Sequence, residues 1–102
     1  MIFAERVYAL CKKIPKGRVS TYGSIAKTLK TSPRAVGQAL KKNPYAPVVP
    51  CHRVVCSDGS IGGFDGKTSG KEIKKKISLL ASEGVEVKNS QISAFKKVKF
   101  NF

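Results

Sequence analysis

Two short amphipathic helical patterns stand almost back to back in the first half of the chain, and this arrangement constrains the fold more than any other feature. Thr21 is a good N-cap for the first pattern, which repeats apolar residues at Tyr22, Ile25, Ala26 and Leu29. The second pattern has Ser32 as its N-cap and Pro33 at the first helical position. It continues from Arg34 to Lys42 and ends at Asn43-Pro44. Two short helices joined by a tight turn predict a helix-turn-helix.

Two further helices flank this unit. The first begins at Phe3, carries apolar residues at helical spacing up to Ile14 and stops at Pro15-Lys16-Gly17. The second begins at a capping box, Ser69-Gly70-Lys71-Glu72, and runs to Ser82-Glu83, with Gly84 as its stop signal.

Strand signals are few. Valine pairs around the central cysteine suggest short extended segments, and Pro47 and Pro50 exclude an ordinary central strand there. One or two short strands are expected between Val85 and Phe102. A length of 102 residues suits one domain, residues 1–102. The sequence predicts a mostly α fold with a small β component, a winged helix-turn-helix-like DNA-binding domain.

The exposed face of the predicted third helix is small, polar and basic. Its apolar side holds Ala35, Val36, Ala39 and Leu40, and its other side holds Arg34, Gly37, Gln38 and Lys41. Glycine inside a helix costs about 1 kcal/mol relative to alanine. Gly37 is explained equally well by the close approach of a nucleic acid and by packing against another helix of the domain.

The charge balance points to a polyanionic partner. Twenty Lys and Arg face six Asp and Glu, which gives a net charge of +14 and a pI of about 10.1. The alternative is a solvated basic surface that only maintains solubility. The late helix carries Lys71, Lys74, Lys75 and Lys76, which we interpret as solvated charge that strengthens the attraction to DNA. No membrane segment or export signal is visible. We expect a cytoplasmic protein, associated with the nucleoid in a prokaryote, or a nuclear protein in a eukaryote.

Three cysteines without a paired motif, together with a single histidine, make a disulfide framework and a zinc site poor explanations. We therefore expect no metal and a reducing, intracellular compartment. Cys11 lies on the apolar stripe of the first helix and is interpreted as a core thiol. Cys56 has no neighbouring base and is interpreted as a small buried residue.

Cys51 is followed directly by His52, the only histidine, and an imidazole that takes the thiol proton would make this cysteine a nucleophile. Neighbours in an extended segment point to opposite faces, so a water or an unusual turn would have to connect them. A carboxylate that orients the histidine would complete the arrangement. A buried structural Cys-His pair is the alternative, and Arg53 could be a surface charge or part of a structural pair.

The segment Pro50-Cys51-His52-Arg53-Val54-Val55 resembles the active-site motif of the O6-alkylguanine-DNA alkyltransferases. The motif is highly specific, and the agreement covers nearly the whole chain in the order of that family. It extends to Gly17-Arg18-Val19-Ser20-Thr21-Tyr22, Arg34-Ala35-Val36-Gly37, Asn43-Pro44, Gly62-Gly63-Phe64 and Leu79-Leu80-Ala81-Ser82-Glu83-Gly84.

The resemblance implies a role for each residue of the active site. Cys51 would accept the alkyl group, His52 would remove its proton through a water, and Glu83 would orient His52. Asn43 would support the turn that holds the active-site segment. The substrate pocket would be formed by Pro50, Val54, Gly63 and Phe64.

The resemblance also implies how DNA is bound. Arg34 would enter the base stack from the minor groove, Tyr22 would help to rotate the nucleotide outward, and the helix that carries Arg34 would be the recognition helix. Small residues such as Ala35 and Gly37 would let that helix come close to the groove. The expected DNA contacts are Tyr22, Arg34, Ala35, Gly37, Gln38, Lys41 and Arg53.

The activity implied is repair by direct reversal: irreversible transfer of an alkyl group from guanine O6 to Cys51 in one turnover, without a cofactor. The partner is double-stranded DNA that contains O6-alkylguanine, and the protein is expected to be monomeric. The alkylated base must be flipped out, because O6 is not accessible in the stack.

Two departures from the family and two rival functions stand beside this interpretation. Larger members carry an additional amino-terminal domain, and many members have Tyr at the position of Phe64, so the rate or range of alkyl groups could differ. The alkyltransferase-like proteins bind lesions without chemistry and typically have Trp at the nucleophile position, so Cys51 favours the enzyme. A winged-helix regulator of intact DNA is the third function, and it would discriminate among undamaged sequences.

Overall fold

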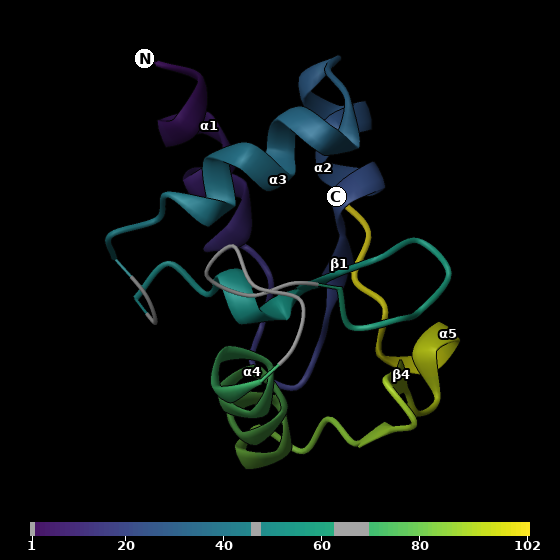
Figure 1. Cartoon of the computed structure of the whole chain (residues 1–102). Coiled ribbons are helices and arrows are strands. Elements are labelled where there is room, and N and C mark those ends of the chain that lie inside the picture. Colours follow the sequence, from purple (N-terminus) through teal and green to yellow (C-terminus); the bar gives the residue numbers. More distant parts are fainter. Residues whose placement is uncertain (1, 46–47, 63–69) are drawn as a thin grey trace.

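The computed structural model describes residues 2–45, 48–62 and 70–102. Helices α1 (Phe3–Cys11), α2 (Tyr22–Leu29) and α3 (Pro33–Lys41) form one half of the molecule, and α4 (Lys71–Ser82) lies at the opposite end (Figure 1). A short 3₁₀ helix, η1 (Cys51–Arg53), lies between the two parts. None of the helices in these described ranges is long and apolar enough to cross a membrane.

The helix-turn-helix is confirmed, and its local signals act as predicted. Thr21 Oγ1 accepts a hydrogen bond of 2.9 Å from the backbone N–H of Ser24 at the start of α2. Ser32 Oγ accepts one of 3.1 Å from Ala35 at the start of α3. Lys30 adopts a left-handed conformation with φ of 57°, which lets the chain reverse between the two helices.

Helix α1 is shorter than the sequence pattern suggested. It ends at Cys11, after which Lys13 and Ile14 donate backbone hydrogen bonds of 3.0 Å to Leu10 and Cys11. These bonds span three residues and tighten the chain into turns, so Ile14 remains fully buried. The hydroxyl of Tyr8 donates 2.9 Å to Ala39 O and ties α1 to α3.

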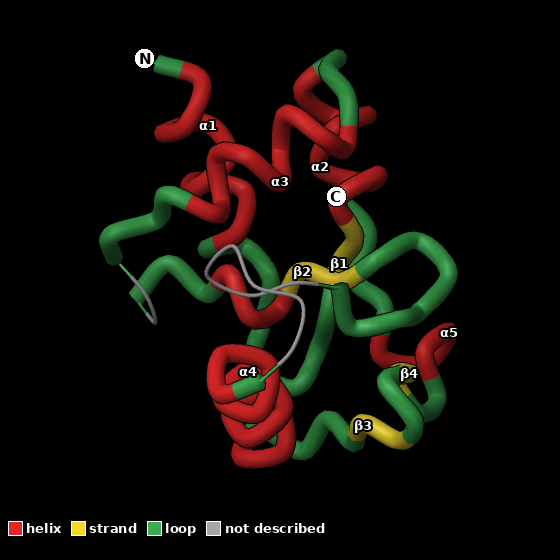
Figure 2. Tube along the Cα trace, viewed as in Figure 1, coloured by secondary structure: helices red, strands yellow, loops and turns green. Residues whose placement is uncertain are grey.

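Within the described residues, the strands form two small pairs (Figure 2). Strands β1 (Ser20–Thr21) and β2 (Val54–Val55) run parallel, with Ser20 opposite Val54. Strands β3 (Val87–Lys88) and β4 (Gln91–Ile92) are antiparallel and confirm the short strands expected in the tail. Helix α5 (Phe95–Val98) follows them and was not predicted.

The core consists of two clusters. One lies among α1, α2 and α3, and it includes Cys51 and Val54 of the central segment. The other joins β1, β2 and α4 to the tail, through Val19, Val55, Ile61, Leu80, Val85 and Ile92. The residues from Cys51 to Val55 therefore bridge both clusters, which fixes their position from two sides.

The predicted capping box does not begin α4. The N-cap of α4 is Gly70, with φ of 82° and no side-chain cap, and Ser69 lies outside the described residues. The predicted end is confirmed: Gly84 has φ of 85°, and Val85 donates a backbone hydrogen bond of 2.9 Å to Leu80 O. Glu83 is thereby held at the carboxyl end of α4.

Candidate active site

Cys51 lies in a tight backbone turn rather than in an extended segment. Pro50 has φ of −81° and ψ of 67°, and Cys51 N donates 2.8 Å to Val49 O, which is the geometry of an inverse γ-turn. The 3₁₀ helix η1 follows at once, with Arg53 N donating 3.0 Å to Pro50 O. The chain therefore turns at Cys51 and does not continue as an extended segment. Both side chains are buried, with 6% and 2% exposed.

The turn is supported by Asn43. Its Nδ2 donates 3.1 Å to Val49 O, and its Oδ1 accepts 2.9 Å from Tyr45 N. The amide therefore closes the loop between the end of α3 and the residue before Pro50. The role that the resemblance implies for Asn43 stays a prediction, and the contact with Val49 O is compatible with it.

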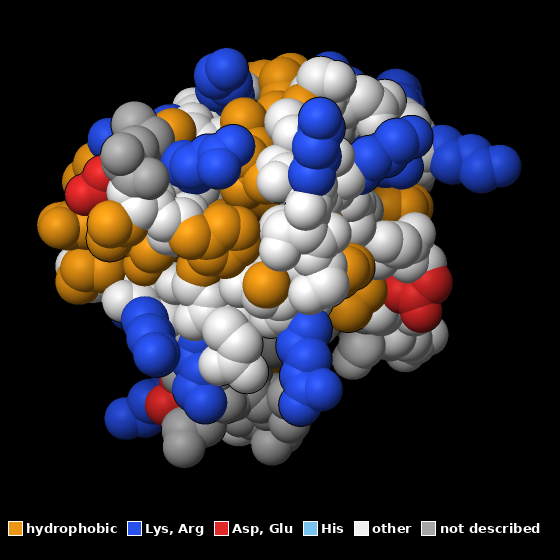
Figure 3. Space-filling view, turned by 90° about the horizontal axis from the view of Figure 1, so that it is seen from above, with side chains coloured by type: hydrophobic (Ala, Val, Ile, Leu, Met, Phe, Trp, Pro, Cys, Tyr) orange, Lys and Arg blue, Asp and Glu red, His pale blue; other side chains and the backbone are white. Residues whose placement is uncertain are grey.

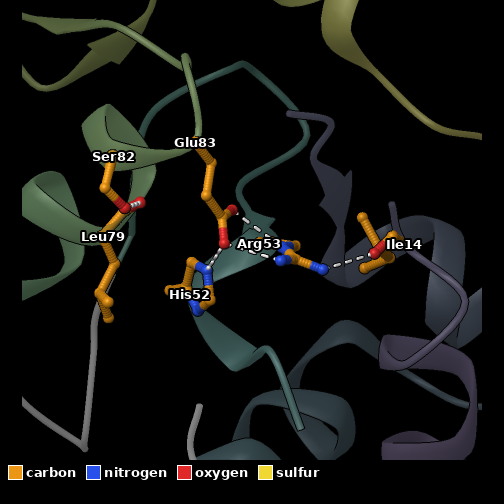
Figure 4. A network of polar contacts seen from close by, with 6 residues as sticks. All are labelled: Ile14, His52, Arg53, Leu79, Ser82 and Glu83. Atoms are coloured by element: carbon orange, nitrogen blue, oxygen red, sulfur yellow. Dashed lines mark hydrogen bonds and ion pairs between the residues drawn. The ribbon is translucent and has the colours of Figure 1, made fainter. Parts of the chain in front are cut away.

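Glu83 brings the end of α4 to the histidine (Figure 4). Its Oε2 lies 3.0 Å from His52 Nε2, and Arg53 donates 2.9 Å to Oε1 and 2.7 Å to Oε2. The remaining Arg53 nitrogen, Nη1, donates 2.9 Å to Ile14 O. The guanidinium thus faces the interior. This favours the structural pair over the DNA contact that the sequence assigned to Arg53.

The contact with Glu83 defines the tautomer of the neutral imidazole. A carboxylate only accepts hydrogen bonds, so Nε2 carries the proton and Nδ1 carries the lone pair. Burial lowers the pKa of His52 and outweighs the opposite effect of Glu83, so the ring is neutral at neutral pH. Nδ1 is buried and has no hydrogen-bond partner among the described residues. His52 therefore presents an available base on the side of the ring away from Glu83.

Glu83 itself remains ionised. Burial raises its pKa, but the hydrogen bonds from Arg53 and His52 outweigh that effect and place the pKa below its usual value. The last turn of α4 is further fixed by Ser82 Oγ, which donates 2.6 Å to Leu79 O (Figure 4). A permanently charged carboxylate can both orient the imidazole and stabilise it once it becomes protonated.

Lys76 corrects the expectation that the lysines of α4 are solvated. Its side chain is fully buried, and Nζ donates hydrogen bonds to Ile61 O and, at 2.8 Å, to Val54 O. It also lies 6.0 Å from the centroid of the Tyr22 ring. Burial lowers its pKa to about 8, an effect opposed by the thiols of Cys51 and Cys56. A buried basic side chain is therefore bound to the backbone of Val54, three residues after Cys51.

The other two thiols have different surroundings. Cys11 is fully buried in the core, as predicted, and burial raises its pKa to about 12. Cys56 is partly buried rather than fully buried as expected. It lies beside Gly62, where an added Cβ would come within 3.1 Å of its sulfur and 3.3 Å of Tyr22. Gly62 thus permits close packing around Tyr22, whose pKa is raised by burial.

The predicted pocket residues are only partly described. Pro50 is buried at the turn, and Val54 is fully buried in the core with its carbonyl bound to Lys76. Gly63 and Phe64 lie outside the described residues. A separate apolar groove of about 610 Å³ lies between α1 and the loop after α3, lined in part by Tyr8 and Tyr45. Neither Cys51 nor His52 lines that groove, so we do not place the reaction there.

The exposed face of α3 matches the predicted face. Arg34, Gln38 and Lys41 are exposed, and Ala35 is half-buried. A Cβ added at Gly37 would meet nothing within 4 Å, so packing against another helix does not explain this glycine. Figure 3 views the end of the molecule where α1, α2 and α3 lie and shows many basic and few acidic side chains there. This surface is exposed and basic, and it is therefore suited to a large anionic partner.

Comparison with known proteins shows similarity over most of the chain. Residues 2–85 match the family model described as "6-O-methylguanine DNA methyltransferase, DNA binding domain". A methylated-DNA–protein-cysteine methyltransferase of Sulfolobus acidocaldarius is 51% identical over 83% of this chain and 51% of its own length. One from Thermococcus kodakarensis is 55% identical over 82% of this chain and 45% of its own length. The chain spans about half the length of these relatives.

Solved structures show the same similarity. The O6-methylguanine-DNA methyltransferase of Pyrococcus kodakaraensis matches with a TM-score of 0.72 and 50% identity, covering 83% of this chain and 47% of its own. Atl1 of S. pombe, in complex with damaged DNA containing O6-carboxymethylguanine, matches with a TM-score of 0.76 and 31% identity. It covers 98% of this chain and 95% of its own. Sequence identity is higher with the methyltransferase, and the TM-score is higher with Atl1.

Proposed function

This chain belongs to the 6-O-methylguanine DNA methyltransferase family, which it matches through the DNA-binding domain, and we propose that it transfers an alkyl group from guanine O6 in DNA to Cys51. The observation that carries this proposal is the His52–Glu83 contact of 3.0 Å next to Cys51 in the same buried turn. That arrangement supplies a nucleophile, a neutral base and a charged residue that orients the base.

The first step is removal of the thiol proton. A water bridges Cys51 Sγ and His52 Nδ1, and the proton passes through it to Nδ1, while Nε2–H remains bonded to Glu83. The ionised carboxylate stabilises the imidazolium that results. A lowered pKa keeps His52 unprotonated, and therefore able to accept the proton, at neutral pH.

The second step is a direct displacement at the alkyl carbon. The Cys51 thiolate forms the S–C bond as the C–O6 bond breaks, and the electron pair of that bond stays on the guanine. The guanine then takes up one proton, which balances the proton lost by the thiol. A thioether is a stable product, so each molecule reacts once.

Lys76 acts on this reaction through Cys51. Its buried ammonium group donates to Val54 O and Ile61 O and provides positive charge that favours the thiolate. Burying a charge costs several kcal/mol unless other groups compensate. A developing thiolate supplies such compensation, and we therefore assign Lys76 as a positioning residue for the nucleophile.

DNA is bound by the face of α3. Arg34, exposed in the first turn of α3, occupies the base stack where the alkylated nucleotide was, and Tyr22 helps to rotate that nucleotide towards Cys51. The lack of a side chain at Gly37 lets α3 come close to the minor groove of the DNA. The open space around Gly37 supports this role. The family resemblance assigns Gly63 and Phe64, which lie outside the described residues, to the pocket for the flipped base.

A second candidate function is recognition of the lesion without chemistry. The observation that favours it is the match with S. pombe Atl1, at a TM-score of 0.76 and 31% identity, in complex with damaged DNA. Cys51 and its buried base favour transfer. The two functions separate in a Cys51→Ala variant: we expect alkyl transfer to be abolished and binding to methylated DNA to be largely intact. Loss of both, in a folded variant, would contradict the assignment of Cys51 as nucleophile.

A further inference from the structure

A polar groove of about 600 Å³ lies between α2 and the carboxyl-terminal residues, and it shares no lining residue with the Cys51 site. Helix α2 contributes three of its polar side chains, the loop after β2 contributes one, and the last residues contribute two. These side chains are Ser24, Lys27, Thr28, Ser57, Lys99 and Asn101. No role assigned above uses this groove.

The carboxyl-terminal side of the groove is firmly attached to the fold. Arg18 donates 2.9 Å from Nε to Val98 O and 2.7 Å from Nη2 to Lys99 O. Val19 exchanges backbone hydrogen bonds with Val98 and Phe100. The backbone of Lys99 is thus held beside the residue that precedes β1. Residues 86–102 lie beyond the family match at 2–85, so this attachment is additional to the matched domain.

The groove is positively charged. Lys27 is exposed, Lys99 is half-buried, and no acidic residue is among the described residues that line the groove. The nearest acid in sequence, Asp58, faces its own turn, where Oδ1 accepts 2.9 Å from Ser60 N and 2.7 Å from Ser60 Oγ. Lys99 Nζ lies 5.9 Å from the centroid of the Phe95 ring, at the end of a flexible side chain that a phosphate can draw into the groove. Two lysines, together with the hydroxyl and amide groups of Ser24, Ser57 and Asn101 on the lining, are suited to phosphate oxygens.

We propose that this groove binds the phosphodiester backbone of duplex DNA beside the segment contacted by α3. In a helix-turn-helix the second helix lies in the groove and the first crosses the backbone, and here the first helix is α2. Residues 86–102 add Lys99 to that contact. The proposal rests on the proposed binding of DNA through α3, and it is independent of the reaction at Cys51.

Salt dependence tests this contact in the full chain. The double variant Lys27→Gln/Lys99→Gln is compared with Lys74→Gln/Lys75→Gln, which removes two exposed charges of α4 and therefore has the same net charge. Affinity for one undamaged and one O6-methylguanine duplex is measured from 50 to 200 mM salt. Each lost phosphate contact lowers the slope of log affinity against log salt by about 0.9.

We expect the slope of log affinity against log salt to be shallower by about 1.8 in the groove variant than in the wild type. From 50 to 200 mM salt its affinity should therefore fall about tenfold less than that of the wild type, and the effect should be equal for both duplexes. Lys99→Arg, alone, should keep the wild-type slope. A groove variant with the slope of the α4 control would overturn the proposal, provided that both melt at the wild-type temperature. Methyl transfer to Cys51, measured in the same samples, reports separately on the proposed reaction.

Discussion

His52 Nε2 lies 3.0 Å from Glu83 Oε2, although the two residues are 31 positions apart in the sequence. Arg53 donates two hydrogen bonds to the same carboxylate. Arg53 thereby fixes Glu83, and Glu83 fixes the imidazole with its lone pair at Nδ1. This arrangement supports the proposed roles of Cys51 as nucleophile and His52 as its base. A third group that orients the base is the common feature of such relays.

Glu83→Gln should slow alkyl transfer on the order of 100-fold, because general-base catalysis of this kind contributes about 10² to 10⁴. The amide oxygen can still accept from Nε2–H, but it cannot stabilise the imidazolium as a carboxylate does. Single-turnover transfer of a labelled methyl group measures the rate. Glu86→Gln, at an exposed position three residues away, is the matched control and should react as wild type. Equal rates in the two variants would exclude Glu83 from the reaction.

The pH dependence follows from His52 and Glu83. The pKa of each is lowered in the folded protein, so the unfolded chain binds more protons and stability is lost as pH falls. The loss should begin near the ordinary histidine pKa of 6.5 and continue below the glutamate value of 4.5. Transfer should slow over the histidine range as His52 becomes protonated. Thermal melting and transfer rates between pH 4 and 9 check both, and a transfer rate that rises as pH falls would contradict the role of His52.

Lys76→Met should slow transfer at least about tenfold and move the reaction of Cys51 with iodoacetamide to higher pH, because the charge that stabilises the thiolate is gone. Lys76→Arg should restore part of both effects. In the wild type, the pKa of Lys76 is lowered from the ordinary 10.5 to about 8. Between these pH values Lys76 stays protonated only in the unfolded chain, so the free energy of unfolding should rise with pH. That rise should be absent in Lys76→Met. If the pH dependence of the iodoacetamide reaction were unchanged, Lys76 would have a structural role only.

Arg34→Ala should weaken binding to damaged and undamaged duplex alike, by about 1 to 2 kcal/mol, or roughly tenfold. The reason is the exposed position of Arg34 at the start of the open face of α3. Fluorescence anisotropy with both duplexes measures the effect, with Lys75→Ala on α4 as a control of equal charge. An affinity equal to that of the control would reject α3 as the recognition helix.

Local signals in the sequence predicted the helix-turn-helix well. Thr21 and Ser32 cap their helices through contacts within three residues, so the necessary information lies in short segments. The ends that depend on tertiary packing were less predictable. Helix α1 ends early because the chain tightens into turns after Cys11, and α4 begins at Lys71 with Gly70 as its N-cap in place of the predicted Ser69.

The site could be predicted only in part. Resemblance placed Glu83 with His52, whereas spacing could not, since the contact depends on how α4 packs beside η1. Lys76 was missed, although a signal existed: positions 73, 76, 77 and 80 follow the i, i+3, i+4, i+7 pattern of a buried stripe. A lysine in such a stripe marks either an error in the pattern or a buried charge. The inward orientation of Arg53 had no such signal, because its partner Ile14 lies 39 residues away.

The most direct measurement is mass spectrometry of the intact protein and its peptides after incubation with a duplex that contains O6-methylguanine, with Cys51→Ala as control. We predict that each protein molecule gains a single methyl group in place of the thiol proton. The group should be found on Cys51 alone and should be absent from the control. Tight binding to the lesion without any change in mass would contradict the transfer and leave a protein that recognises damage without repairing it.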